Sequence, residues 1–336
     1  MIKAELFEKG SQNQVTCRLC AHQCRLPEGG SGICRVRKNI AGTLYSLNSD
    51  RVIAMHMDPI EKKPLYHFLP GSSSFSIAAM GCNFSCRFCQ NHSISMVQDE
   101  PGISGENVSP EELVQNALDN RARSISYTYT EPTVFFELML QTARLAHQAG
   151  LKNVMVSNGY LSGQALAMLV PYLDAANIDL KAFNDDFYKH YCSARLKPVM
   201  ETIAALKASG VWLEITTLLI PGLNDDREEI KRLILFLLGI DDRMPWHVSR
   251  FFPQYRLRNI PPTAEDSIYG FLRLGAEMGL KYLYGGNLSA DSWNDTVCPQ
   301  CRTKLIRRLG YQTSVLALQA GRCRTCGSAI PGIWEN

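Results

Sequence analysis

The chain has 336 residues, 46% of them hydrophobic, and a formal net charge of only +3. This length is ample for one large α/β domain with small additions, and the charge balance gives no reason to expect nucleic acid or a membrane surface as a partner. No apolar run approaches the roughly 18 residues that a membrane span needs, and the N-terminus lacks the apolar core of a signal peptide. We therefore expect a cytoplasmic protein that binds no membrane.

Twelve cysteines are the most informative feature of the composition. Closely spaced cysteines in a reducing cytosol usually bind metal, whereas a disulfide framework, the alternative, is typical of short secreted chains. Cys192 stands alone, and the other eleven form three groups that we predict to bind metal. These groups are Cys17, Cys20, Cys24 and Cys34; Cys82, Cys86 and Cys89; and Cys298, Cys301, Cys323 and Cys326.

The first group lies in residues 1–74, which we predict to be an N-terminal cysteine-rich module ending in a Gly- and Ser-rich stretch. Four thiolates, or three with His22, can bind either zinc or an iron–sulfur cluster, and the spacing alone does not separate the two. We favour zinc, because this segment precedes the predicted barrel and contributes no strand end to it. A metal here would stabilise a module too short to bury its own core.

Residues 75–290 alternate between strand-like and helix-like patterns. Such alternation implies a parallel sheet with right-handed crossovers, and about six strands fit a partial (β/α)6 TIM-like barrel better than a closed one. Ligands in such sheets bind beyond the carboxyl ends of the strands. The expected strands are 75–80, 124–129, 153–157, 176–180, 211–220 and 247–252, with a weaker one at 281–284; the expected helices are 110–120, 133–148, 163–169, 198–209, 225–238 and 263–278.

Cys82, Cys86 and Cys89 follow the first expected strand directly, within eight residues. A [4Fe–4S] cluster usually has four cysteine ligands, so three ligands leave one iron open for chemistry. A zinc site or a structural cluster is the alternative at this spacing. The position at the carboxyl end of a strand favours the catalytic interpretation.

The pattern Cys-x-x-x-Cys-x-aromatic-Cys at residues 82–89 resembles the signature of the radical S-adenosyl-L-methionine (SAM) superfamily. The resemblance implies a [4Fe–4S] cluster whose open iron is chelated by SAM. An electron from the cluster then cleaves SAM to methionine and a 5′-deoxyadenosyl radical, which makes the protein an oxidoreductase-like or activase-like enzyme. Phe88 stands at the aromatic position, which lies next to the adenine in this family.

The same resemblance assigns cofactor-binding residues at other strand ends. Glu131 matches the acid that binds the methionyl amine, although the family's preceding glycines are replaced by Tyr129 and Thr130. Ser157 and Asn158 resemble residues that contact SAM in activating enzymes of glycyl-radical enzymes. The alternatives are an acid at a helix N-terminus for Glu131 and an ordinary Asn-Gly turn for Ser157 and Asn158.

Asp179 and Lys181 match an Asp-Leu-Lys segment of those activating enzymes, and their spacing puts them on one face of a strand. They could bind the amino-acid part of SAM or the substrate, or form a structural ion pair. His247 and Arg250 lie on opposite faces of a later strand, and one of these faces should line the barrel. Our candidate catalytic residues are therefore Lys181, His247 and Arg250, with Phe88, Glu131, Ser157, Asn158 and Asp179 binding the cofactor.

Residues 291–336 form the third segment, which we predict to be a zinc-ribbon-like module. Two Cys-x-x-Cys knuckles, separated by 21 residues, can each supply two tetrahedral ligands. Zinc is the first interpretation, a rubredoxin-type iron the second and an auxiliary [4Fe–4S] cluster the third. With zinc in both flanking modules, we expect about two zinc and four iron per chain.

Over nearly the full chain, the sequence resembles the radical SAM enzyme of the AmmeMemoRadiSam system, and beyond that group pyruvate formate-lyase activating enzymes. The stretches that carry this resemblance include residues 17–34, 58–68 and 129–132. The resemblance implies Memo-like and AMMECR1-like protein partners and an electron donor such as flavodoxin or ferredoxin.

Three functions compete at this point. The enzyme abstracts hydrogen from a small or partner-presented substrate, installs a glycyl radical on a partner enzyme, or modifies RNA. RNA is the less favoured partner, because solvated basic faces are common. Its support is a set of basic residues in the last segment, namely Arg302, Lys304, Arg307, Arg308, Arg322 and Arg324.

Overall fold

A computed structural model describes residues 1–97, 102–288 and 293–334 of the chain. Its centre is an eight-stranded sheet with the order β16-β15-β14-β13-β12-β11-β9-β8. All neighbours pair in parallel except β8, which runs antiparallel to β9 at the edge. The strands are β8 (Ala54–Pro59), β9 (Ser73–Ala78), β11 (Ser124–Tyr127), β12 (Lys152–Ser157), β13 (Ala175–Asp179), β14 (Trp212–Leu219), β15 (Trp246–Arg250) and β16 (Leu283–Gly286).

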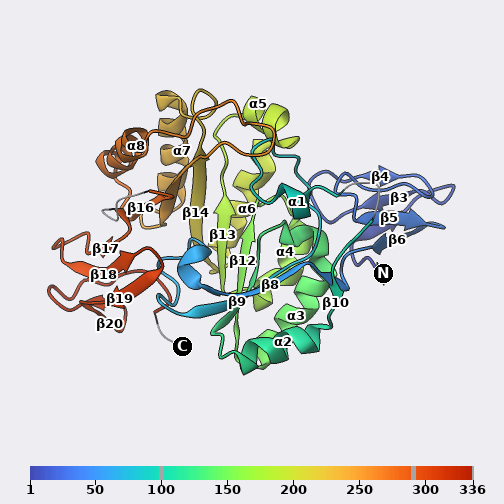
Figure 1. Cartoon of the computed structure of the whole chain (residues 1–336), viewed down its shortest axis with the longest axis horizontal. Coiled ribbons are helices and arrows are strands. Elements are labelled where there is room, and N and C mark those ends of the chain that lie inside the picture. Colours follow the sequence, from blue (N-terminus) through green and yellow to red (C-terminus); the bar gives the residue numbers. More distant parts are fainter. Residues whose placement is uncertain (98–101, 289–292, 335–336) are drawn as a thin grey trace.

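Six helices connect the parallel strands and cover the outside of the sheet (Figure 1). Helix α2 begins with a capping box, in which Ser109 accepts a hydrogen bond from the Glu112 backbone and the Glu112 side chain accepts one from Ser109. Six strand–helix units followed by β16 make an incomplete barrel, so the predicted α/β class is confirmed. The helices are α2 (Pro110–Asp119), α3 (Phe136–Gln148), α4 (Gly163–Leu169), α6 (Leu196–Ala208), α7 (Arg227–Ile240) and α8 (Glu265–Met278).

Short helical turns fill several of the connections. They are η1 (Ile60–Lys62), α1 (His92–Ser95), η2 (Pro132–Phe135), η3 (Val170–Tyr172), α5 (Asp185–Phe187) and the π-helical η4 (Tyr188–Cys192). Among the described residues, no helix has the length and apolar character needed to cross a membrane.

The N-terminal residues form two small antiparallel sheets at one end of the molecule (Figure 1). Their anchor is a buried ion pair in which Arg37 donates to both carboxylate oxygens of Glu137 on α3, at 2.9 and 2.6 Å. Residues 54–59 lie within the predicted N-terminal segment, yet they extend the core sheet as β8. The small strands are β1 (Ile2–Lys3), β5 (Arg37–Ile40) and β6 (Thr43–Ser46); β2 (Phe7–Lys9), β3 (Val15–Cys17) and β4 (Arg25–Leu26); and the pair β7 (Arg51–Val52) and β10 (Glu106–Asn107).

The C-terminal module lies at the opposite end (Figure 1), and its predicted start at residue 291 falls outside the described residues. Arg308, which the sequence placed on a basic face, is instead fully buried and donates to the backbone oxygens of Tyr66 and Asn294, at 2.7 and 3.0 Å. It therefore joins the module to the barrel. The strands are β17 (Thr296–Val297), β18 (Lys304–Leu309), β19 (Gln312–Val315), β20 (Leu318–Gln319) and β21 (Arg322–Cys323).

Candidate active site

A cavity of about 800 Å³ opens inside the barrel and reaches the carboxyl ends of its strands. Cys82, Cys86 and Cys89 line it together, as the sequence predicted for one site. The predicted cofactor-binding residues Phe88, Glu131, Ser157, Asn158 and Asp179 line the same cavity, as do Lys181 and His247. The structure thus brings together all but one of the predicted residues of this site.

The loop that carries the three thiols is held in a tight conformation. Gly81 has φ +110°, and a Cβ there would lie only 2.8 Å from Cγ1 of Val36, so both the backbone conformation and the space require glycine. The backbone N–H of Phe84 donates to Sγ of Cys82 at 3.3 Å. The side chain of Asn158 donates to the side-chain oxygen of Asn83 at 2.8 Å, which ties the loop to the end of β12.

This donor set fits a [4Fe–4S] cluster with one open iron. Three thiols face one cavity, and the side-chain nitrogen of Asn83 in the same loop is buried with no hydrogen-bond partner within the described part of the chain. Cys192 is buried against Cys86 and is not among the residues that line this cavity. When bound, such a cluster supplies the electron for reductive cleavage of SAM.

Glu131 organises the ends of two strands. Its carboxylate accepts hydrogen bonds from the backbone N–H and hydroxyl of Thr133, the hydroxyl of Ser157 and the backbone N–H of Asn158, all between 2.6 and 3.0 Å. Burial raises its pKa, while these bonds act in the opposite direction. Glu131 is therefore the N-cap of η2 and a cavity residue at once, so the two interpretations of this acid do not exclude each other.

Asp179 and Lys181 form an ion pair of 2.9 Å on the cavity wall. The Nζ of Lys181 also lies 5.9 Å from the ring centre of Phe88. Burial alone would lower the pKa of Lys181, but Asp179 and the thiolate of Cys86 hold it well above its usual value. This raised pKa favours the protonated form of Lys181, which can hold an anionic group.

His247 lines the cavity, whereas Arg250 does not. Nε2 of His247 lies 2.6 Å from a carboxylate oxygen of Glu214, which is buried below the cavity. Arg250 instead donates to the backbone oxygen of Thr263 and to Glu265 on α8, at 2.6 and 3.0 Å. It is not among the cavity's lining residues, because β15 alternates its side chains between the two faces. A catalytic role for Arg250 stays a prediction that its contacts do not support.

A cluster of charged residues at the cavity has no role assigned by the sequence analysis. Asp58 accepts hydrogen bonds from Lys62 and Lys63, at 2.8 and 2.6 Å, and from the hydroxyl of Tyr129. Burial lowers the pKa of Lys63 to about 8. Tyr129 has φ +64°, the left-handed conformation that a glycine adopts readily. The two adjacent lysines at the end of η1 are the feature of the sequence that could have indicated this cluster, but only the fold brings them to the cavity.

The C-terminal quartet has the geometry of a mononuclear metal site. Its four sulfur atoms all lie within 4.8 Å of one another, and the Cys298–Cys326 and Cys301–Cys323 pairs are each 3.6 Å apart. Tetrahedral zinc with Zn–S bonds of about 2.3 Å requires sulfur–sulfur distances of about 3.8 Å. The predicted cysteine-rich metal site at this end is therefore present, although these distances alone do not identify the metal.

Comparison with known proteins agrees with this site. Residues 77–234 match the radical SAM superfamily. An uncharacterized protein of Methanocaldococcus jannaschii is 40% identical over 333 residues, which cover 98% of this chain and 99% of that protein. The pyruvate formate-lyase-activating enzyme of Clostridium pasteurianum is 22% identical over 197 residues, covering 54% of this chain and 80% of that enzyme.

Among solved structures, a radical SAM methyltransferase from Sphaerobacter thermophilus has a TM-score of 0.51 and 15% identity, with 65% of this chain and 67% of that chain covered. This likeness concerns the fold. Residues 77–234 form a radical SAM superfamily domain, and the chain is a radical SAM enzyme.

Proposed function

We propose that this enzyme cleaves SAM reductively and abstracts hydrogen from a small polar substrate. The observation that carries the proposal is the single cavity that holds both the three loop thiols and a separate group of polar side chains. Its volume of about 800 Å³ lies within the range of small-molecule sites, roughly 300 to 1,000 Å³. SAM occupies the part near the loop, and the substrate occupies the remainder.

The substrate end of the cavity favours an anionic group. Lys62 and Lys63 line it together with Tyr66 and with Tyr311 from the turn between β18 and β19. Two cations share the one carboxylate of Asp58, so this group of side chains retains a positive charge. Because Tyr311 is exposed at the cavity rim, the C-terminal module contributes to substrate selection as well as to stability.

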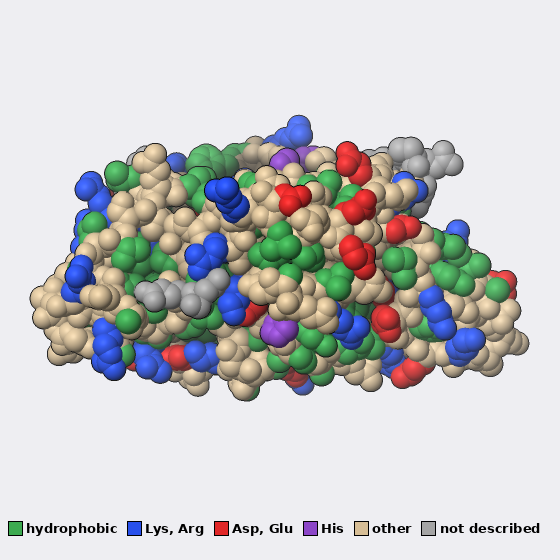
Figure 2. Space-filling model, turned by 90° about the horizontal axis from the view of Figure 1, so that it is seen from below, with side chains coloured by type: hydrophobic (Ala, Val, Ile, Leu, Met, Phe, Trp, Pro, Cys, Tyr) green, Lys and Arg blue, Asp and Glu red, His purple; other side chains and the backbone are tan. Residues whose placement is uncertain are grey.

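The finer assignment to the AmmeMemoRadiSam group, with Memo-like and AMMECR1-like partners and a cytoplasmic location, is part of this proposal and rests on the sequence motifs. Activation of a glycyl-radical enzyme is the alternative supported by the activating-enzyme relative. Modification of RNA rests on the basic C-terminal end. Figure 2 shows several Lys and Arg side chains there, but Arg308 no longer belongs to that surface.

Deuterium transfer distinguishes these functions. The holoenzyme is incubated anaerobically with SAM, dithionite and fractions of an extract from cells grown in D₂O, and the 5′-deoxyadenosine is examined by mass spectrometry. We expect deuterium from the small-molecule fraction. Transfer only from the protein fraction would instead identify an activase, and transfer only from RNA would identify an RNA-modifying enzyme.

A substrate-side variant sharpens this test. Lys62→Ala should lower deuterium transfer roughly tenfold, the loss expected for one charged hydrogen bond, while substrate-free SAM cleavage is unchanged. Lys197→Ala, at an exposed position on α6, is the matched control and should leave both activities unchanged. Equal deuterium transfer by Lys62→Ala and wild type would remove the anionic-substrate assignment.

A further inference from the structure

The N-terminal quartet, Cys17, Cys20, Cys24 and Cys34, is a second candidate metal site outside the SAM cavity. Cys17 and Cys20 are buried, and Cys24 and Cys34 are half-buried. The four are neighbours in space: the backbone N–H of Cys17 donates to the backbone oxygen of Cys24 at 2.9 Å, and charge on Cys17, Cys24 or Cys34 acts on the thiol of Cys20. The fold has thus gathered four thiols from the end of β3 and from the connections that follow it.

The spacing of these thiols differs from that of a closed zinc site. Across the part of the chain that the structure describes, Cys298, Cys301, Cys323 and Cys326 are the only group of potential ligand atoms that approach within 4.8 Å of one another. The sulfur atoms of the N-terminal quartet do not all lie within this distance of one another, and neither do those of Cys82, Cys86 and Cys89, which fit a cubane cluster. In a cubane each thiolate binds a different iron, so its sulfur atoms stand farther apart than around one zinc ion.

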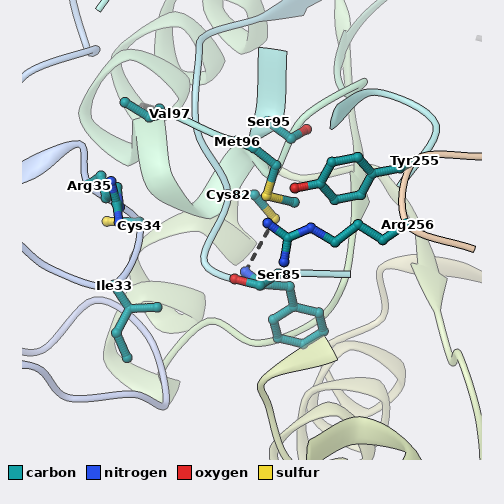
Figure 3. A pocket seen from close by; sticks show the side chains of 11 residues that line it. Ile33, Cys34, Arg35, Cys82, Ser85, Ser95, Met96, Val97, Tyr255 and Arg256 are labelled. Atoms are coloured by element: carbon teal, nitrogen blue, oxygen red, sulfur yellow. Dashed lines mark hydrogen bonds between the residues drawn. The ribbon is translucent and has the colours of Figure 1, made fainter. Parts of the chain in front are cut away.

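The quartet also lies directly against the SAM-cluster loop. A Cβ at Gly81, the residue before Cys82, would be 3.5 Å from the backbone oxygen of Cys34. His22, within the quartet, lies with Nε2 at 2.8 Å from the backbone oxygen of Asn83 and donates to it. Cys34 and Cys82 line one pocket of about 500 Å³, and Figure 3 shows Cys34 beside Arg35 and Cys82 beside Met96.

A buried cation adjoins the quartet. Burial raises the pKa of the Cys17 and Cys34 thiols, and the charge of Arg37, which is 1% exposed, acts on both in the opposite direction. Its Nε is buried and has no hydrogen-bond partner among the described residues, although its other nitrogens bind Glu137. An anionic metal–thiolate centre would use both the charge and the remaining N–H of this side chain.

From this spacing and placement, we infer that the N-terminal quartet binds a second [4Fe–4S] cluster beside the SAM-cluster loop, in place of the zinc that the sequence favoured. The inference is independent of SAM cleavage and of the substrate. It makes the two flanking modules chemically different, with an iron–sulfur centre at one end and a mononuclear metal at the other.

Metal content and spectroscopy of the anaerobically reconstituted full chain test the inference. Two cubanes and one closed thiolate site predict about eight iron and one zinc per chain. The triple variant Cys82→Ala, Cys86→Ala, Cys89→Ala should retain about four iron, and dithionite reduction should give it the electron paramagnetic resonance signal of a reduced [4Fe–4S] cluster. An iron-free triple variant, or wild-type protein with about four iron and two zinc, would overturn the inference.

Two further double variants, each made in that triple-variant background, locate the iron. Cys17→Ala with Cys20→Ala should remove the remaining iron and keep the zinc. The matched control, Cys298→Ala with Cys301→Ala, should keep the iron and lose the zinc. Iron that persists in the first of these variants also contradicts the inference, and if that variant fails to fold, the iron content and spectrum of the triple variant decide alone.

Discussion

The two flanking modules each offer four thiols, but they hold them differently. In the C-terminal module, two Cys-x-x-Cys knuckles face each other and close the sulfur atoms to within 4.8 Å. In the N-terminal module, one thiol lies at the end of β3 and the others lie in the connections that follow, and the four sulfur atoms do not all approach within 4.8 Å of one another. Equal numbers of cysteines therefore do not imply the same metal, because the backbone that carries them sets the distance between the ligands.

The attachments of the modules to the barrel differ as well. The N-terminal module is joined by the Arg37–Glu137 ion pair, with both side chains 1% exposed. The C-terminal module is joined by Arg308, which lies 3.7 Å from Glu61 with both side chains fully buried, and by contacts around His67. Nδ1 of His67 donates to the backbone oxygen of Pro331 at 2.7 Å, and its Nε2 accepts from the hydroxyl of Tyr284 at 2.6 Å. Both attachments therefore contain a buried ion pair, and the C-terminal one adds an uncharged imidazole.

The largest expected effect comes from removing two of the four cysteines of the C-terminal quartet. Cys298→Ala with Cys301→Ala should unfold the C-terminal module, because binding to structural zinc sites contributes on the order of 10 kcal/mol to small domains. Limited proteolysis should then cut after about residue 293, while the barrel stays resistant. A variant that has lost its metal but keeps a protease-resistant C-terminus would show that the module folds on its own contacts.

Breaking the Arg37–Glu137 ion pair should lower the free energy of unfolding by a somewhat smaller amount. Arg37→Met leaves Glu137 buried without its partner, and such a change typically destabilises by about 3 to 5 kcal/mol. Urea unfolding followed by circular dichroism measures the loss. Lys197→Met, which breaks an exposed ion pair with Glu201, should leave the unfolding midpoint unchanged. Equal midpoints for the Arg37 and Lys197 variants would contradict the anchoring role.

The buried imidazole of His67 in the C-terminal attachment makes stability depend on pH. Burial lowers the pKa of His67 to about 4, whereas an unfolded histidine titrates near about 6.5. At a pH between these two pKa values, the unfolded state binds the proton and the folded state does not. The free energy of unfolding is therefore at its full value above about pH 6.5, and it falls by about 3 kcal/mol as the pH drops to 4. His67→Gln should reduce this dependence of the free energy of unfolding on pH, and His190→Gln, at an exposed position, should retain it. An unchanged pH dependence in His67→Gln would show that another group takes up the proton.

The sequence predicted the barrel well, because strand and helix patterns there alternate clearly. The expected helix 163–169 coincides with α4, and the expected strand 211–220 contains β14. Strand β8 was missed, because its residues Ala54–Pro59 mix polar and apolar side chains without a regular period. A strand with this pattern is defined by its partner β9 and not by its own sequence.

For the site, motif residues were predictable and contacts were not. The thiol loop, Glu131 and the Asp179–Lys181 pair follow from short patterns at strand ends. The charged cluster around Asp58 depends on residues that are far apart in the chain, since Tyr129 reaches it from the loop after β11. Arg308 looked like a surface cation, and only the packing of β18 against Tyr66 shows that it is buried.

The most direct test of the radical SAM assignment compares two neighbouring cysteines. Cys86 lines the cavity with the other loop thiols, whereas Cys192 is buried beside Cys86 and lines neither pocket. With SAM and dithionite under anaerobic conditions, Cys86→Ala should form no 5′-deoxyadenosine, and Cys192→Ala should form it as the wild type does. Wild-type amounts of 5′-deoxyadenosine from Cys86→Ala would contradict the assignment of the three loop thiols to the SAM-cleaving cluster.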